Sequence, residues 1–224
     1  MDFKHRLNRS FKPRFAIIYP FGLFFLLFGS IDDHSLRAGI GYVISGLLIR
    51  LWSNGYAIKN DKLTTSGPYA YVRNPLYLGT FLTVFGFTLM LNLNLEPGYV
   101  FIVRLLFLGA LGFVYYNTIK SEEGMLREKF GKSYEDYCIK VFTLIPRLTP
   151  YLQGEKWPFD MQRLIYSKEY KSLFWITVII IAFHLKGRLF VEHKGMTQHA
   201  WGLVLLGAAL IMLDIFYELT KKKK

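Results

Sequence analysis

Two short polar segments interrupt the long apolar stretches of this chain, and their residue types suit the binding of a charged small molecule. The first, residues 60–79, reads NDKLTTSGPYAYVRNPLYLG. Gly67-Pro68 forces a turn, and Pro75 stands where a missing N–H costs nothing, at the first turn of a helix with Asn74 as its N-cap. Because a helix N-terminus presents free N–H groups and a partial positive charge, this end suits a carboxylate such as that of a methionine moiety.

The second polar segment, residues 118–147, carries two adjacent carboxylates, Glu122 and Glu123. Neighbouring residues on a helix point about 100° apart, so one carboxylate can face a cleft while the other faces water. An acidic group suits the ammonium group or the ribose hydroxyls of a nucleoside cofactor, and it can accept a proton from an amine nucleophile. Taken alone, the pair is better explained as two solvated charges at the start of a helix.

The elements that must position these segments are membrane helices. The chain has 224 residues, of which 52% are hydrophobic and 17% aromatic, more than one water-soluble core of this size usually needs. Crossing a bilayer core of about 30 Å takes about 20 mostly apolar residues in a helix. Six stretches meet or nearly meet this requirement, namely residues 15–31, 36–58, 76–95, 99–119, 172–189 and 199–217.

The distribution of basic residues predicts the orientation of the six spans. Of the 28 Lys and Arg residues, 22 fall in the segments 1–14, 59–75, 120–171 and 221–224, which all lie on one side of the membrane, and four fall on the other side. By the positive-inside rule, the basic segments and both chain termini are cytoplasmic. The net charge of +12 therefore reflects membrane topology, and we expect membrane lipids as partners and no nucleic acid.

These patterns predict an all-α fold, a polytopic transmembrane helical bundle with a cytoplasmic amphipathic helical cap. Residues 1–150 form a four-span core on this interpretation, and the apolar spacing within 120–150 predicts the amphipathic cap. Residues 151–171 form a cytoplasmic linker, and residues 172–224 form a two-span extension. A single cysteine, Cys138, excludes an intrachain disulfide and a cysteine metal cluster, and no metal site is expected.

The two polar segments together resemble a known enzyme family. Residues 67–79 read GPYAYVRNPLYLG, and after a predicted membrane hairpin residues 122–137 follow the pattern Glu-Glu-x-x-Leu-x-x-x-Phe-Gly-x-x-Tyr-x-x-Tyr, closed by Pro146. These motifs are similar to those of the isoprenylcysteine carboxyl methyltransferase and phospholipid methyltransferase family, over about residues 36–148. The resemblance implies an integral membrane methyltransferase whose cofactor, S-adenosylmethionine, is held by the loop before the third span and sealed by the glutamate-bearing helix.

The resemblance also implies which residues contact that cofactor. By motif position they are Asn54, Asp61, Lys62, Leu63, Thr64, Tyr69, Asn74, Pro75, Leu76, Tyr77 and Glu122. A neighbouring residue, Arg73, is expected to orient an anionic head group, with a snorkelling side chain bound to lipid phosphate as the alternative. The candidate catalytic residues are therefore Arg73, Glu122 and Glu123.

Two positions depart from the family pattern. Many members have His where this chain has Asn74, and an amide can hydrogen-bond but cannot titrate near neutral pH. The prenylcysteine enzymes carry a substrate-binding Arg where this chain has Thr118, so a prenylcysteine carboxylate is a poorer fit as the acceptor. The acceptor is therefore left as a lipid-like or small molecule with a carboxylate or an amine as its nucleophile.

Methyl transfer from a sulfonium is an in-line displacement, so the tasks of such a protein are alignment and the exclusion of water. Two other functions stay open at this point: an NADPH-dependent membrane reductase of the sterol-reductase type, which shares a similar motif, and a non-catalytic membrane protein with the same fold. The pair Glu122 and Glu123 favours the methyltransferase. Arg50, inside the second span, either lines the cofactor or substrate cavity or pairs with another polar group.

Overall fold

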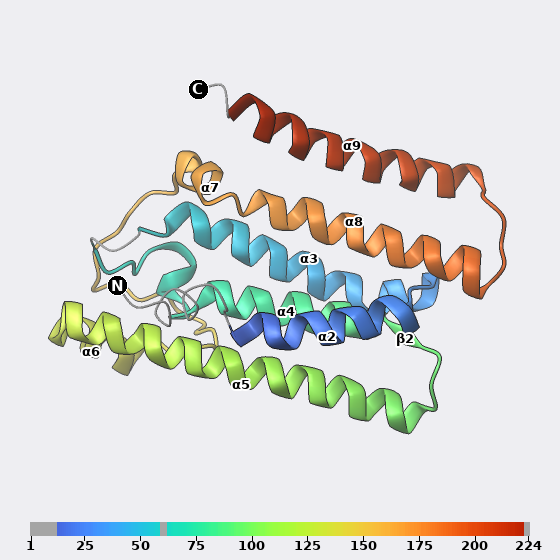
Figure 1. Ribbon diagram of the computed structural model, residues 1–224. Helices are drawn as coiled ribbons and strands as arrows, with labels where there is room; N and C mark the ends of the chain where they lie inside the picture. Colours follow the sequence, from blue (N-terminus) through green and yellow to red (C-terminus); the bar gives the residue numbers. More distant parts are fainter. Residues whose placement is uncertain (1–12, 59–61, 222–224) are drawn as a thin grey trace, which may run out of the picture. The chain divides into compact units, whose positions relative to one another are not determined.

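The structure is a computed structural model that describes residues 13–58 and 62–221. The described residues form two compact units, one made of residues 13–29 and 93–140 and the other of residues 30–58, 62–92 and 141–221. Nearly all regular structure is helical, as Figure 1 shows. The predicted all-α fold class is therefore confirmed.

Among its described residues the first unit contains three helices, α2 (Pro13–Phe28), α5 (Pro97–Phe130) and α6 (Lys132–Lys140). Phe107 of α5 packs against Phe21 and Phe25 of α2, with ring centroids 5.0 and 5.1 Å apart. Sequence analysis placed the fourth span at 99–119, whereas α5 continues without a break to Phe130, a length of about 51 Å at 1.5 Å per residue. It ends at Gly131, whose φ of 50° favours glycine.

The second unit contains most of the remaining elements. They are α3 (Asp33–Tyr56), the short helix η1 (Gly67–Ala70), α4 (Pro75–Met90), α7 (Met161–Ser167), α8 (Tyr170–Lys186), the π turn η2 (Gly187–Val191) and α9 (Gln198–Lys221). Within this unit α4 lies beside α3, α3 beside α8, and α8 beside α9 (Figure 1). Two strands of two residues each, β1 (Gly29–Ser30) and β2 (Asn92–Leu93), pair where the chain passes from one unit to the other.

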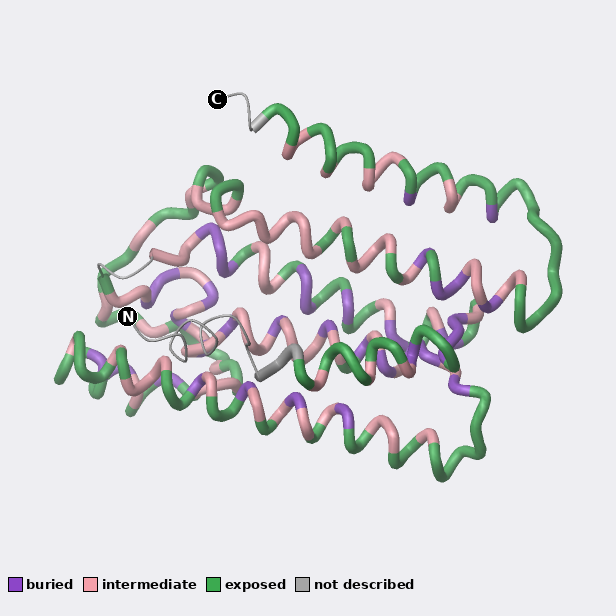
Figure 2. Tube along the Cα trace, in the orientation of Figure 1, coloured by how far each residue is buried: buried purple, intermediate pink, exposed green. Residues whose placement is uncertain are grey.

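Every predicted span coincides with one of these helices. Three helical stretches are long and apolar enough to cross a membrane, Pro97–Phe130, Tyr170–Val191 and Gln198–Thr220, and two shorter apolar ones are Ala16–Phe28 and Pro75–Met90. Most of α9 is exposed along its length (Figure 2), and its exposed side chains are largely apolar. An apolar surface of this kind is suited to lipid, which identifies the chain as a membrane protein.

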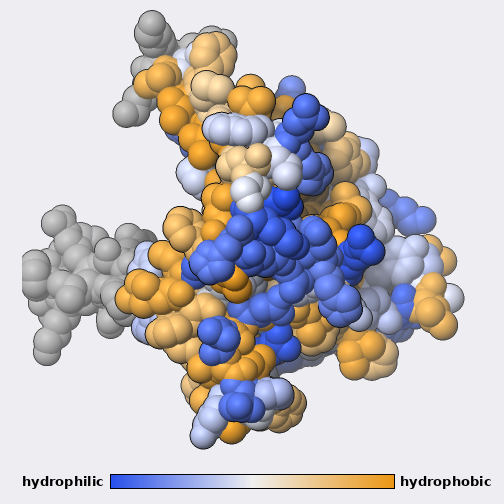
Figure 3. Space-filling view, turned by 90° about the vertical axis from the view of Figure 1, so that its right-hand side faces the viewer, coloured by the Kyte–Doolittle hydropathy of each residue, from blue (hydrophilic) through white to orange (hydrophobic). Residues whose placement is uncertain are grey.

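Hydrophilic side chains gather on the face of the molecule that carries the α8–α9 connection, with hydrophobic side chains around them (Figure 3). The helix termini at this face leave backbone groups without partners inside the helices, and these groups need water or polar side chains. A polar face at the ends of apolar helices is therefore the arrangement expected where helices leave a bilayer.

The contact between α3 and α4 depends on glycine. A Cβ atom at Gly79 would lie 2.6 Å from the carbonyl oxygen of Gly46, and one at Gly86 would lie 2.6 Å from that of Gly39. Because each clash involves backbone, neither helix could accommodate it without moving away. Small residues let membrane helices approach closely, and this approach sets the position at which the loop before α4 begins and ends.

We predict that Gly86→Ala destabilises the protein by roughly 1–3 kcal/mol, because the added methyl group meets backbone that cannot give way. Thermal unfolding in detergent micelles measures the effect. The control is Gly41→Ala on the exposed face of α3, where no atom lies within 4 Å of the new Cβ and the substitution should be neutral or stabilising. Equal unfolding midpoints for the two variants would contradict the prediction.

The start of α3 is fixed by a capping box. The backbone N–H of Ser35 donates to the Asp32 carboxylate at 2.7 Å, and the Asp32 N–H donates to the Ser35 hydroxyl at 3.1 Å. The amide of Asn92 donates to the second carboxylate oxygen of Asp32 at 2.8 Å. These hydrogen bonds, led by the one from the Ser35 backbone, hold the pKa of Asp32 below its ordinary value.

We therefore predict that Asp32→Ala lowers the free energy of unfolding by about 1 kcal/mol at pH 7. A carboxylate whose pKa is lower in the folded state stabilises above its unfolded pKa, and this contribution is lost as the pH falls through the folded pKa. The difference between wild type and variant should thus shrink below about pH 4. Chemical denaturation of wild type and variant in mixed micelles, at pH 7 and below about pH 4, measures this difference. A difference that grows on acidification would refute the prediction.

Candidate functional site

The five residues that precede α4 are held by a later part of the same unit. The backbone N–H groups of Arg73 and Asn74 donate to the carbonyls of Phe142 and Thr143, at 2.9 and 3.1 Å. Two further bonds run the other way, from the N–H of residue 147 to the oxygen of Tyr71 at 2.9 Å and from that of residue 151 to the oxygen of Ala70 at 2.8 Å. Residues 141–151 therefore fix the backbone at 70–74.

Arg73 contributes to the same attachment through its side chain. Its guanidinium donates to the Val141 carbonyl at 2.8 Å and to the Thr143 hydroxyl at 2.5 Å. A planar guanidinium with several donors can satisfy two oxygens in this way without loss of its charge. Arg73 thus has a structural role that sequence analysis did not predict, while its role toward an anionic head group stays a prediction.

The predicted start of the third span is confirmed at α4. Pro75 occupies the first helical position and Asn74 the N-cap position, where its carbonyl accepts from the Leu78 N–H at 3.1 Å. The Asn74 side chain makes no capping hydrogen bond to the helix, contrary to the usual use of Asn at this position. The first turn of α4, which includes Leu76 and Tyr77, keeps the N–H groups that any helix N-terminus offers to an anion.

Residues 62–64 of the loop before α4 are also held by contacts with other parts of the unit. The Thr64 hydroxyl accepts a hydrogen bond from the Ile58 N–H at 3.2 Å, which closes the end of α3 onto the loop. The Lys62 ammonium lies 3.6 Å from the Glu155 carboxylate and 4.2 Å from the centre of the Trp157 ring. Leu63 is half-buried between these anchors, whereas Asp61 lies outside the described residues.

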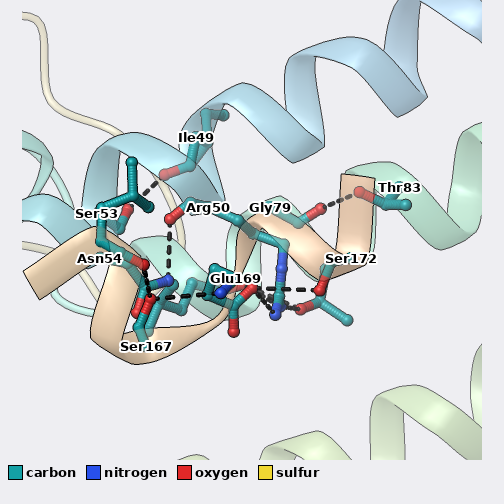
Figure 4. Close-up of polar contacts among 12 residues, drawn as sticks. Ile49, Arg50, Ser53, Asn54, Gly79, Thr83, Ser167, Glu169 and Ser172 are labelled. Atoms are coloured by element: carbon teal, nitrogen blue, oxygen red, sulfur yellow. Dashed lines mark hydrogen bonds and ion pairs between the residues drawn. The ribbon is translucent and has the colours of Figure 1, made fainter. Parts of the chain in front are cut away.

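Arg50 is a charged residue in the interior of α3, and it is paired. Its Nη2 lies 2.6 Å from the Glu169 carboxylate, and its Nη1 donates to the Thr80 hydroxyl and, at 3.4 Å, to the Leu76 carbonyl (Figure 4). About a fifth of each side chain of the pair is exposed. Of the two alternatives left open for Arg50, pairing with a polar group is the one that the structure shows.

Asn54 belongs to the same group of contacts, one turn further along α3 (Figure 4). Its amide donates to the Arg50 carbonyl at 3.0 Å, and only 6% of the residue is exposed. Glu169 accepts a second hydrogen bond, from Ser172, at 3.3 Å. Arg50 therefore connects the first turns of α4, the end of α3 and the start of α8.

The remaining predicted site residues are distributed between the units. Tyr69 lies half-buried in η1, close in sequence to the fixed residues 70–74. Glu122 and Glu123 belong to the other unit, half-buried on α5, where sequence analysis placed the start of a separate surface helix. The two glutamates thus lie on the same continuous helix as the fourth span.

Sequence analysis missed Glu155, Trp157 and Glu169, which all lie in the segment predicted as a linker. One signal was present for Glu169, because a charge at the position of Arg50 inside a span requires a counter-charge and Glu169 immediately precedes the fifth span. No periodicity or motif in the sequence marks the contacts of Glu155 and Trp157. These contacts could be found only from the tertiary structure.

Residues 38–133, less than half of the chain, match the family model described as phospholipid methyltransferase. This part of the chain is similar to the phospholipid methyltransferase family. The matched residues fall inside the range 36–148 that the motifs indicated, so the resemblance found in the sequence is confirmed.

Two curated proteins to which this chain is similar differ in kind. Protein-S-isoprenylcysteine O-methyltransferase of Schizosaccharomyces pombe is 39% identical over 88 residues, 39% of this chain and 34% of that enzyme. Nickel-cobalt-cadmium resistance protein NccN of Alcaligenes xylosoxydans xylosoxydans is 29% identical over 116 residues, 51% of each chain. The aligned part thus covers about half or less of these relatives, and no solved structure matches the chain.

We predict that Glu169→Ala destabilises the protein by roughly 1–3 kcal/mol, because it leaves the Arg50 charge without its partner in a poorly hydrated site. The double variant Arg50→Met/Glu169→Ala should recover part of this loss, since it removes both charges. Thermal unfolding in micelles measures both effects. Lys194→Ala is the control, because its pair with Glu192 is largely exposed and should be worth little.

This account of Arg50 and Glu169 would be contradicted if the double variant lost more free energy of unfolding than the Arg50→Met and Glu169→Ala single variants lose together. So would a Glu169→Ala variant that unfolds at the wild-type temperature.

Proposed function

We propose that this membrane protein is an S-adenosylmethionine-dependent methyltransferase that acts on a lipid-like or small acceptor at the cytoplasmic face. The observation that carries the proposal is the loop before α4, which lies inside the family-matched segment and is fixed at both ends by hydrogen bonds from residues 141–157. We further propose six spans with both termini in the cytoplasm, supported by six matching helices and by the distribution of Lys and Arg.

The residues around this loop fit the proposed cofactor. The N-terminus of α4 suits its carboxylate, and the hydroxyls and half-buried apolar side chains at 62–69 suit a nucleoside. The indole Nε1 of Trp157, which lies beside Lys62, is a buried donor with no acceptor among the residues that the structure describes. Such a donor is expected where a ligand supplies the acceptor.

The cofactor would bring an electrophilic methyl group on sulfur, and the protein would align it and exclude water. Residues 62–64 and 74–77, with Asn54, Tyr69 and Glu122, are proposed to bind and orient it, as the family resemblance implies. A carboxylate acceptor needs no base. An amine acceptor must lose a proton, and Glu122 or Glu123 is proposed to accept it.

A transfer assay with native lipids tests this function. The full chain in lipid nanodiscs is incubated with methyl-labelled S-adenosylmethionine and a native lipid and small-molecule extract, and labelled products are found by mass spectrometry. We expect Glu122→Gln to reduce labelling at least tenfold, because the proposed cofactor contact and proton acceptor loses its charge. The control is Glu128→Gln, an exposed carboxylate on the same helix, which should label like wild type.

Equal labelling by wild type and Glu122→Gln would show that Glu122 has been assigned wrongly. A chain that transfers no label but binds NADPH in a direct titration, and does not bind S-adenosylmethionine, would replace this proposal with the reductase function.

A further inference from the structure

Residues 154–160, which we call the strap, follow the family-matched segment and lie along the loop before α4. The hydroxyls of Thr65 and Ser66 donate to the Glu155 carbonyl at 3.1 and 3.0 Å. The Ser66 hydroxyl in turn accepts from the backbone N–H of Trp157 at 2.6 Å. Thr65 and Ser66 are both about 95% buried. The strap therefore provides hydrogen-bond partners for two buried hydroxyls, which would destabilise the fold if they had none.

The two ends of the strap are fixed as well. At the first end, a Cβ atom at Gly154 would lie 2.7 Å from the Cβ of Thr65, so only glycine allows this approach. At the other end, the N–H of Asp160 donates to the Gly55 carbonyl at 2.9 Å, and the Phe159 ring packs edge-on against a tyrosine of α3 at 5.7 Å. The side chain of Trp157 is therefore held in a defined place.

Trp157 presents two chemical groups at this place. Its ring faces the Lys62 ammonium at 4.2 Å, a cation–π contact. Its indole N–H is buried, and within residues 13–58 and 62–221 it has no hydrogen-bond acceptor. A buried N–H without an acceptor is uncommon in native proteins, and the explanation to look for is an acceptor that arrives with a ligand.

We propose that Trp157 is a further cofactor-binding residue, whose indole N–H donates to an acceptor atom of the nucleoside part of the sulfonium methyl donor. This inference rests on the proposed function. The neighbouring residues favour the methyl donor over the hydrocarbon part of a lipid-like methyl acceptor as the ligand of Trp157. Lys62, Leu63 and Thr64 are the expected cofactor contacts, and the strap contacts this same loop. The ring nitrogens and ribose oxygens of a nucleoside supply hydrogen-bond acceptors, which a hydrocarbon tail lacks.

Binding of S-adenosylhomocysteine, the product left when the donor loses its methyl group, tests the inference without catalysis. Isothermal titration calorimetry of the full chain in nanodiscs compares wild type with Trp157→Phe, which keeps an aromatic ring under Lys62 and removes the N–H. We expect Trp157→Phe to bind about fivefold more weakly, the usual worth of one hydrogen bond. Trp201→Phe is the control, since Trp201 is exposed on α9 and should bind like wild type.

The outcomes separate the inference from the function on which it rests. If wild type binds and Trp157→Phe binds equally well, the role of Trp157 is overturned while the methyl-donor site stands. If wild type does not bind S-adenosylhomocysteine at all, the proposed function fails and the inference fails with it.

A second measurement does not depend on the folding of Trp157→Phe. The wild-type chain is labelled with 5-fluorotryptophan, and its four fluorine resonances are assigned through substitutions at Trp52, Trp175 and Trp201, which leave Trp157 by elimination. Saturation with S-adenosylhomocysteine should shift the Trp157 resonance. An unchanged Trp157 resonance at a concentration where calorimetry shows saturation would overturn the proposal.

Discussion

The close approach of α3 to α4 is the constraint on which the rest of the second unit depends. Glycines at 39 and 46 on one helix face glycines at 86 and 79 on the other, and backbone contacts backbone where side chains would normally stand. In a membrane, where lipid is as apolar as the helix surface, such close contact is a main source of helix association. With the two helices fixed, hydrogen bonds to later parts of the unit hold residues 65–74 of the loop between them.

The chain beyond the family-matched segment supplies many of those hydrogen bonds. Residues 141–151 pair with the backbone just before α4, and the strap covers the beginning of the same loop. Glu169, at the start of α8, neutralises the charge that α3 carries inside a span. Residues 141–169 are thus structurally part of the candidate site, although the match to the family model ends at residue 133. A match to a family model can therefore leave out residues that hold a site in place.

The six helices and the start of α4 could be predicted because they depend on local rules of apolar length, Pro at the first helical turn and capping residues. The continuation of α5 to Phe130 was not predicted, because the charged residues after 119 match a surface helix as well as the end of a long one. The partners of Arg73 and Lys62 were not predictable either. Each lies 68 or more residues away in sequence, and a hydrogen bond or a cation–π contact leaves no periodic trace in the sequence.

The central claim is that the loop between α3 and α4 binds a sulfonium nucleoside. Hydrogen exchange of the full chain in nanodiscs, followed peptide by peptide with and without saturating S-adenosylhomocysteine, tests this claim directly. The account predicts slower exchange of backbone amides within residues 62–77, because the ligand would exclude water from this loop and accept hydrogen bonds from the first turn of α4. Unchanged exchange across residues 62–77, with or without protection elsewhere in the chain, would contradict it.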